Sequence, residues 1–415
     1  MSAILRKLLL GVALACPIAS ASANVIADWD AKAVAIIAPA VPAPLSQREA
    51  AMVNVAMFDA VNAIGRRYQP YLFKQDSAPE TSQEAAAAAA AAAVLTGLHP
   101  EAASDIKAAV GKYLATIADS TAKTEGVRLG EAVAAAILQA RVTDGATAPD
   151  AYRPKTKPGV WVPTPAAVAS VWPNMRPFAL ASQSQFRPGP PPALDSKEWA
   201  ADYNEIKAYG SKTSALRSPQ QTETARFWLA VGPAAYHQIP RQLILAQKMD
   251  ILDSARLMAL YSVALTDAYV AVFDAKYHYE FWRPITAIRN GDIEENATNK
   301  RDATWQPIDN TPMHPEYPCA HCINAAAGAA VLEGVLGSRT IPEVAMTSTA
   351  APGVTHRFTD LDALCEEVSN ARVWAGFHYR SSAAVGTAMG RQIGEYVVQN
   401  VMQPTTSRAV ASGGR

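Results

Sequence analysis

The chain gathers its histidines and several basic residues between residues 276 and 380. Five of the seven histidines lie in this stretch: His278, His314, His321, His356 and His378. Basic and imidazole side chains together can neutralise an anion, transfer protons and bond to a reacting centre. The stretch therefore predicts a cationic pocket for a small oxyanion.

Two of the basic blocks have spacings that bring cations together. Lys276 and Arg283 are seven residues apart, which is two helical turns, so both can point to the same side. Arg372 and His378 flank Gly376, and a glycine permits a turn that directs both side chains at one point. At an effective dielectric near 20, each cation about 4 Å from a unit negative charge gains about 4 kcal/mol. Only a ligand with several negative charges would offset the repulsion between these clustered cations.

A third block, residues 314–321, places a histidine at the expected start of a helix. Pro318 precedes Cys319, Ala320 and His321, and this order predicts a tight turn that leads into a helix. The first amides of that helix would point at an anion. The third block therefore adds backbone donors and an imidazole to the predicted pocket.

The three blocks resemble the signature that vanadium-dependent haloperoxidases share with type 2 phosphatidic acid phosphatases, namely K-x6-R-P, P-S-G-H and S-R-x5-H-x3-D. The corresponding residues here are Lys276-x6-Arg283-Pro284, Pro318-Cys319-Ala320-His321 and Ala371-Arg372-x5-His378. Residues 53–62, the proline-rich stretch and residues 282–289 are also similar to bacterial vanadium haloperoxidases. The resemblance covers most of the chain after its first 23 residues.

This resemblance implies a vanadate cofactor and a role for each matching residue. His378 would be the axial vanadate ligand, or the nucleophile toward phosphate, and His321 would be the acid–base group. His314 occupies the position at which bromoperoxidases of the family carry histidine. The oxyanion contacts would come from Lys276, Arg283, Cys319, Ala320 and Arg372.

The reaction implied by the resemblance is the oxidation of halide by hydrogen peroxide, with a small organic acceptor, in an enzyme that could be a homodimer. Two other functions remain open. One is an exported acid phosphatase that uses His378 as nucleophile and His321 as general acid. The other is an oxyanion-binding protein without catalytic turnover.

The chain departs from the family pattern at two important positions. Cys319-Ala320 replaces Ser-Gly, and a thiol donates a weaker hydrogen bond than a hydroxyl. Cys319 and Cys322 could instead form a disulfide, and a zinc site with His321 is a further alternative. Ser382 replaces the acidic residue that would orient His378, and a serine can do so only feebly. We interpret Glu316, Glu280, Glu366 and Glu367 as surface charges.

Composition and the N-terminus narrow the class of protein. The 37 basic and 37 acidic residues cancel, which argues against a general nucleic-acid binder. Arg6 and Lys7, an apolar run and Ala21-Ser22-Ala23 predict a signal peptide that is cleaved after Ala23, so the protein would be periplasmic or secreted. A lipoprotein anchored through Cys16 is an alternative. No later segment is expected to span a membrane, because none offers about 18 uncharged apolar residues.

The elements that must position the site are predicted to be helices, because strand-like alternation is nearly absent. We expect an all-α fold, a helical bundle of the vanadium haloperoxidase type. Its parts would be a signal peptide (1–23), an N-terminal helical layer (24–148), an ordered proline-rich strap (149–195), a C-terminal helical bundle with the oxyanion site (196–403) and a disordered tail (404–415). Predicted helices cover residues 47–68, 82–98, 101–118, 124–143, 196–209, 219–231, 235–248, 250–279, 324–336, 360–375 and 377–399.

Overall fold

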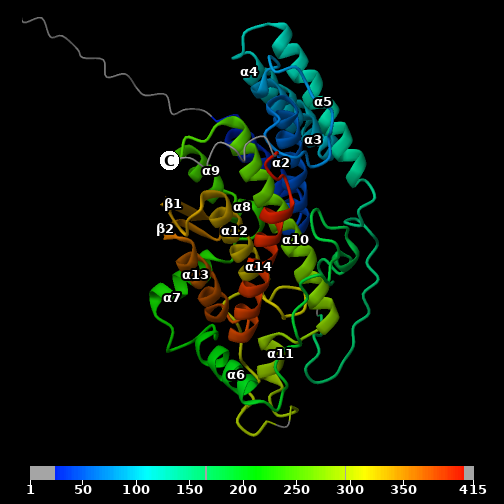
Figure 1. Cartoon of the computed structure of the whole chain (residues 1–415). Coiled ribbons are helices and arrows are strands. Elements are labelled where there is room, and N and C mark those ends of the chain that lie inside the picture. Colours follow the sequence, from blue (N-terminus) through cyan, green and yellow to red (C-terminus); the bar gives the residue numbers. More distant parts are fainter. Residues whose placement is uncertain (1–23, 164–165, 295, 406–415) are drawn as a thin grey trace, which may run out of the picture.

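The computed structural model describes residues 24–163, 166–294 and 296–405, and these are mostly helical (Figure 1). The predicted signal peptide lies outside the described residues. The helices are α1 (Val25–Ala40), α2 (Ala43–Gly65), α3 (Gln83–Leu98), α4 (Ala103–Leu114), α5 (Thr121–Arg141), α6 (Lys197–Tyr209), α7 (Pro219–Phe227), α8 (Gly232–Tyr236), α9 (Gln238–Ala246), α10 (Ile251–Tyr279), α11 (Pro284–Arg289), α12 (Ala320–Leu336), α13 (Leu361–Trp374) and α14 (Arg380–Asn400). Short 3-10 turns lie at Pro100–Ala102 and Trp172–Asn174.

The central element is α10, which packs against α2, α12 and α14 (Figure 1). Asp250 caps its N-terminus by accepting from the Asp253 amide. By length and composition alone α10 could cross a membrane, although it carries charged residues such as Arg256 and Asp267. However, the apolar window of this helix is 100% buried inside the protein. Its apolar length therefore supplies the core of the bundle.

The N-terminal helices pack onto this core and form one continuous apolar cluster with the C-terminal bundle. α3 carries the alanine run and packs closely on α5, where a Cβ at Gly130 would lie 2.4 Å from the carbonyl oxygen of Ala86. The structure also contains α1, which the sequence prediction missed. Asn24 caps α1 by accepting from the amides of Ile26 and Ala27.

Three glycines on α14 bring this helix against α12 and so fix the start of α12. A Cβ at Gly386, Gly390 or Gly394 would lie within 2.6 Å of a backbone oxygen of α12 or its cap. Only glycine fits at such a close approach between helices. Close packing of α14 against the backbone of α12 therefore fixes the position of the α12 N-terminus.

The proline-rich strap is ordered, as predicted, and it is fastened to α10. The amides of Phe178, Ala179 and Leu180 donate to the buried carboxylate of Asp267 at 2.6, 2.7 and 2.9 Å. Further along the strap, Arg187 forms a bidentate pair with Asp274, with both nitrogen–oxygen distances at 2.7 Å. Two carboxylates of one helix thus hold the strap along the bundle.

A β-hairpin is the main departure from an all-helical chain. β1 (Thr340–Ser348) pairs antiparallel with β2 (Ala351–Asp360), with Val344 opposite Phe358. The apolar side chains of Val344, Met346 and Phe358 are buried. We missed the hairpin because its inward-facing apolar positions are few and irregularly spaced. It is a two-stranded addition to the helical fold.

The end of the chain is ordered further than we predicted. Tyr68 pairs with Pro404, and the Thr405 amide donates to the carbonyl of Arg67 at 3.0 Å. The expected disordered tail from residue 404 is therefore wrong for these two residues. Residues 406–415 lie outside the described residues.

Candidate active site

Lys276 lies in the last turn of α10 and is fully buried. Its Nζ donates to the carbonyl oxygens of Pro315 and Glu316 at 3.0 and 2.6 Å. Burial, together with the nearby Arg283, lowers the pKa of Lys276 well below its usual range. The two carbonyls fix the ammonium group beside the 314–321 segment.

Arg283 caps the short helix α11 and lies between two histidines. Its Nε donates to the carbonyl of His314 at 2.8 Å, and its Nη1 donates to the carbonyl of Phe377 at 2.9 Å. The same guanidinium approaches His314 Nδ1 at 3.0 Å and His378 Nε2 at 3.3 Å. Because arginine only donates, His378 Nε2 presents a lone pair to it, whereas His314 Nδ1 also lies 3.2 Å from the carbonyl oxygen of Pro315. Arg283 therefore ties the first block to the other two.

The turn at Gly376 brings Arg372 and His378 together. Arg372 lies in the last turn of α13, and the amides of Phe377 and His378 both donate to its carbonyl oxygen. Gly376 has a φ of +78°, which glycine adopts without the steric cost of a Cβ. The turn has the form that the spacing predicts.

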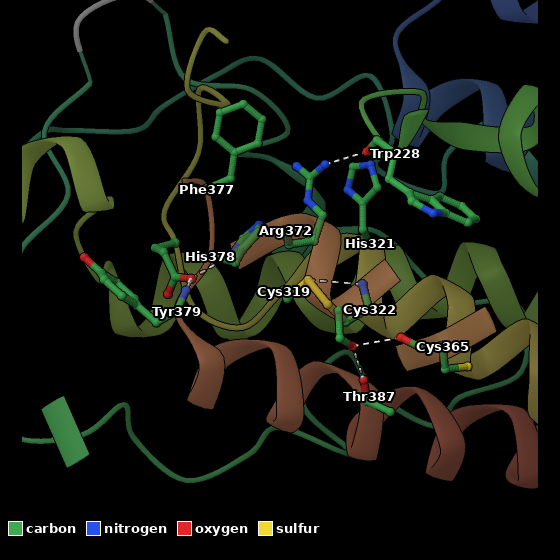
Figure 2. Close-up of a disulfide and its surroundings, with 12 residues drawn as sticks. Trp228, Cys319, His321, Cys322, Cys365, Arg372, Phe377, His378, Tyr379 and Thr387 are labelled. Atoms are coloured by element: carbon green, nitrogen blue, oxygen red, sulfur yellow. Dashed lines mark hydrogen bonds and ion pairs between the residues drawn. A yellow bond between two sulfur atoms is a disulfide. The ribbon is translucent and has the colours of Figure 1, made fainter. Parts of the chain in front are cut away.

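Arg372 is buried beside His321 and below Trp228 (Figure 2). Its Nη1 donates to the carbonyl of Trp228 at 2.6 Å, and its guanidinium lies 5.0 Å from the centre of the Phe377 ring. Its Nε is buried and has no hydrogen-bond partner within the described ranges. A donor of this kind is costly to bury, and an anion would satisfy it.

His321 lies in the first turn of α12, next to Ala320. Its Nε2 is 3.1 Å from the carbonyl oxygen of Ala230, so Nε2 carries the hydrogen and Nδ1 presents a lone pair. The first amides of a helix have no partner within the helix. The predicted combination of helix start and imidazole is therefore present.

These groups border a cavity of about 360 Å³. Ala320, His314, His321, Arg372 and His378 line it on one side. The remaining wall is mainly apolar and includes Pro44, Val168, Leu229, Tyr269, Phe273 and Phe377. Arg283 faces an adjoining polar cavity of about 750 Å³, and the two cavities share residues 309, 310, 312 and 313. Lys276 lines neither cavity and acts from behind the 314–321 segment.

Glu316 is a site residue that the sequence analysis assigned to the surface. The structure buries it completely, and its Oε1 lies 2.8 Å from His378 Nδ1 and 3.1 Å from the amide of Tyr379. Its neighbours in the sequence offered a signal, because Pro315, Tyr317 and Pro318 surround it with residues that favour a packed turn. The interpretation of Glu316 as a surface charge is therefore wrong, and His378 has a carboxyl partner other than residue 382.

Cys319 and Cys322 form a disulfide in the first turn of α12 (Figure 2). Cys319 is fully buried and lines neither cavity. A disulfide sulfur carries no hydrogen, so the predicted contact of a Cys319 thiol with the oxyanion does not hold for this pair. Across residues 24–163, 166–294 and 296–405 no group of three histidine, cysteine or acidic side chains could hold a metal ion, which removes the zinc alternative.

The site is strongly cationic and poorly solvated. Burial lowers the pKa of Arg283 to about 10 and that of Arg372 to about 9. Burial and the neighbouring guanidinium groups also lower the pKa values of His314, His321 and His378 well below 6.5, so the three imidazoles are neutral near pH 7. Burial raises the pKa of Glu316 to about 7 although Lys276 and Arg283 oppose the shift. The basic side chains of Lys276, Arg283 and Arg372 thus outnumber the carboxyl groups of Glu316 and of Asp309, which lines both cavities, and a multiply charged anion would balance them.

The other histidines and acids of this stretch lie elsewhere. His278 is exposed at the end of α10, and His356 stacks on Phe227 in the hairpin region. Glu367 pairs with His356, Glu280 pairs with Lys155, and Glu366 is exposed. Of the four glutamates considered, only Glu316 belongs to the site.

Comparison with known proteins agrees with this geometry. Residues 256–407 match the family described as the second helical-bundle domain of VCPO. The C-terminal bundle is therefore similar to a domain of vanadium haloperoxidases. The vanadium chloroperoxidase of Curvularia inaequalis is 31% identical over 191 residues, which cover 38% of this chain and 30% of that protein. The match thus spans less than a third of that relative's length.

Solved structures show that the likeness of fold extends beyond this domain. The first bacterial vanadium-dependent iodoperoxidase superposes with a TM-score of 0.78 at 24% identity, over 92% of this chain and 96% of that one. A holo-type bacterial vanadium-dependent chloroperoxidase gives 0.68 at 14% identity, over 87% and 93%. The expected fold class, a helical bundle of the vanadium haloperoxidase type, is confirmed.

Proposed function

We propose that this protein is a vanadium-dependent haloperoxidase that oxidises halide with hydrogen peroxide at a vanadate bound in the cationic pocket. The observation that carries the proposal is that His321, Arg372 and His378 line one cavity, while Arg283 contacts His378 from the adjoining cavity and Lys276 holds the 314–321 segment from behind. The unpartnered Nε of Arg372 and the lowered pKa values of the three cations fit a multiply charged oxyanion. The named relatives are vanadium enzymes, which favours vanadate as that oxyanion.

Each residue has a separate role in this proposal. Vanadate, when bound, would activate hydrogen peroxide toward attack by halide. His378 would hold vanadium through Nε2, and Lys276, Arg283 and Arg372 would neutralise its oxygens together with the amide of Ala320. His321 would exchange a proton through Nδ1, because its Nε2 is committed to the carbonyl of Ala230. His314 would add a second imidazole to the cavity wall next to Arg283.

The apolar wall of the cavity suits a small organic acceptor. About 360 Å³ admits a molecule with one or two rings, and Phe273 and Phe377 offer aromatic surfaces. Export through the N-terminal signal would place the protein in the periplasm or outside the cell, where a disulfide such as Cys319–Cys322 persists. Homodimer formation stays a prediction.

An acid phosphatase is the second candidate, because phosphate has the shape and charge of vanadate. The orientation of His378 is compatible with this activity as well, since Nε2 presents the lone pair that a nucleophile needs. His321 would then protonate the leaving group.

Reconstitution with orthovanadate tests the proposal. We expect about one vanadium per chain by elemental analysis and peroxide-dependent halogenation of a phenolic dye with iodide or bromide. Because vanadate binds only the folded state, a concentration 100 times Kd should stabilise the protein by about 2.7 kcal/mol, seen as a higher Tm. Arg372→Gln should remove most of this shift, whereas the exposed Arg128→Gln should keep it.

The outcomes separate the candidate functions. Hydrolysis of p-nitrophenyl phosphate by the vanadium-free protein, without halogenation by the loaded protein, would replace the proposal with the phosphatase. Binding of vanadate without either activity would leave only an oxyanion-binding protein.

Restoring the family's serine is a further prediction. In Cys319→Ser/Cys322→Ala the hydroxyl replaces a sulfur that cannot donate, so turnover should rise about tenfold or more. Cys319→Ala/Cys322→Ala is the matched control, because it removes the disulfide without adding a donor. Equal turnover of the two double variants would show that this position does not contact the oxyanion.

A further inference from the structure

We propose that Glu316 is the positioning residue that holds His378 in its reactive orientation, in place of the acidic residue that the family carries at position 382. The Oε1 of Glu316 lies 2.8 Å from His378 Nδ1, and both side chains are almost fully buried. This inference deepens the proposed function, because it rests on His378 being the group that bonds to the oxyanion.

The contacts on either side of the imidazole define its tautomer. Glu316 Oε1 accepts a hydrogen bond from the Tyr379 amide at 3.1 Å. It also acts as the acceptor for His378 Nδ1, so Nδ1 carries the hydrogen. On the opposite side, Arg283 can only donate, so Nε2 presents its lone pair. Only the Nδ1–H tautomer of a neutral ring satisfies both neighbours. That tautomer directs the Nε2 lone pair into the pocket, which ligation and nucleophilic attack both require.

Burial of Glu316 makes a purely structural role a poor explanation. A buried carboxylate is expensive unless its oxygens are paired, and its Oε2 has no hydrogen-bond partner in the described chain. The same residue uses its carbonyl oxygen to hold the Nζ of Lys276 at 2.6 Å. One residue therefore sets the position of two groups of the pocket, Lys276 through its backbone and His378 through its side chain.

The position of Ser382 explains how the acidic group could move. Residue 382 lies four positions after His378, at the start of α14, where the family motif places its acid. Ser382 is fully buried, and its hydroxyl has no hydrogen-bond partner within the described residues. A second carboxylate at position 382 would face Glu316 at short range in a dry environment, and two such charges repel. The serine is therefore compatible with Glu316 as the sole acid beside His378.

Long-range ¹H–¹⁵N spectra of histidine-labelled protein without vanadate test the tautomer directly. The ring nitrogens of His378, assigned by their loss in His378→Gln, should show protonated Nδ1 and bare Nε2 in the native protein. Glu316→Ala should lose this pattern and weaken vanadate binding about 10- to 100-fold in a titration. Glu316→Gln keeps an oxygen that can accept at Nδ1, so it should keep the tautomer and lose less than about tenfold in affinity. Glu366→Ala, an exposed glutamate, is the matched control.

The double variant Glu316→Ala/Ser382→Asp returns the carboxylate to the family's position. Recovery of the Nδ1–H pattern and of vanadate affinity would support the positioning role. Native spectra and native affinity in Glu316→Ala would overturn it, as would a loss that neither Glu316→Gln nor the double variant repairs. None of these readouts requires halide oxidation, so failure of this inference is distinguishable from failure of the proposed function.

Discussion

Replacement of His378 by glutamine is expected to remove vanadate binding and to reduce turnover on the order of 10⁴-fold or more, the scale of losing a group that bonds to the reacting centre. Without Nε2 the pocket retains only the charges of Lys276, Arg283 and Arg372, which attract an oxyanion but make no bond to it. Vanadium content after desalting and steady-state halogenation rates measure the two losses. Phosphate hydrolysis would fall in parallel if the phosphatase were the true activity.

The matched control is His278→Gln, because His278 lies at the end of α10 and is exposed. It should bind vanadate and turn over like the native protein. Retention of stoichiometric vanadium in His378→Gln, after desalting that removes loosely held anions, would show that His378 is not the ligand. An unchanged Tm of the vanadium-free variant would show that the loss is chemical, since His378 packs in the interior.

Local spacing predicts much of this site because each block is a short stretch with one conformation. Lys276 lies in the last turn of a long helix and Arg283 caps the next, so the predicted two continuous helical turns between them are wrong. The break in the chain after Tyr279 fixes their relation. The Gly376 turn does the same for Arg372 and His378. The convergence of the blocks with one another is not local, and the family resemblance supplied it.

Groups whose roles depend on long-range packing escaped the sequence analysis. From sequence alone a glutamate is predicted to be exposed. Glu316 becomes a buried partner only because the fold brings His378, 62 residues later in the chain, next to it. The carbonyls of Trp228 and Ala230 bind Arg372 and His321 through their backbone, so no side-chain type reveals them. The hairpin of β1 and β2 is stabilised by burial against helices, because two strands alone have too little apolar surface.

Replacement of Asp267 by alanine is expected to lower the free energy of unfolding by about 3–5 kcal/mol, the cost of stranding buried partners of a charged group. The carboxylate of Asp267 is fully buried in α10 and accepts from three consecutive strap amides, those of Phe178, Ala179 and Leu180. Removing it leaves these amides without an acceptor next to the core. Chemical denaturation measures the loss, and limited proteolysis should show new cleavage within residues 166–195.

Two further variants test the cause of this loss: Asp267→Asn is the conservative replacement, and Asp292→Ala is the control at an exposed position. Asp267→Asn keeps one side-chain oxygen, but its side-chain NH2 group faces strap amides that can only donate. This variant should therefore lose more than half as much free energy of unfolding as Asp267→Ala. Asp292 is exposed and its alanine variant should change stability by less than about 0.5 kcal/mol.

The strap also carries Val168, which lines the cavity and donates through its amide to the carbonyl of Met313 at 2.8 Å. A released strap should therefore raise KM for the organic acceptor more than it lowers vanadate affinity, because the side chains of Lys276, Arg283, Arg372 and His378 make no hydrogen bond to a strap residue within the described chain. Native stability in Asp267→Ala would mean that the aromatic side chains of the strap hold it in place. The hydrogen bonds to the Asp267 carboxylate would then contribute nothing to stability.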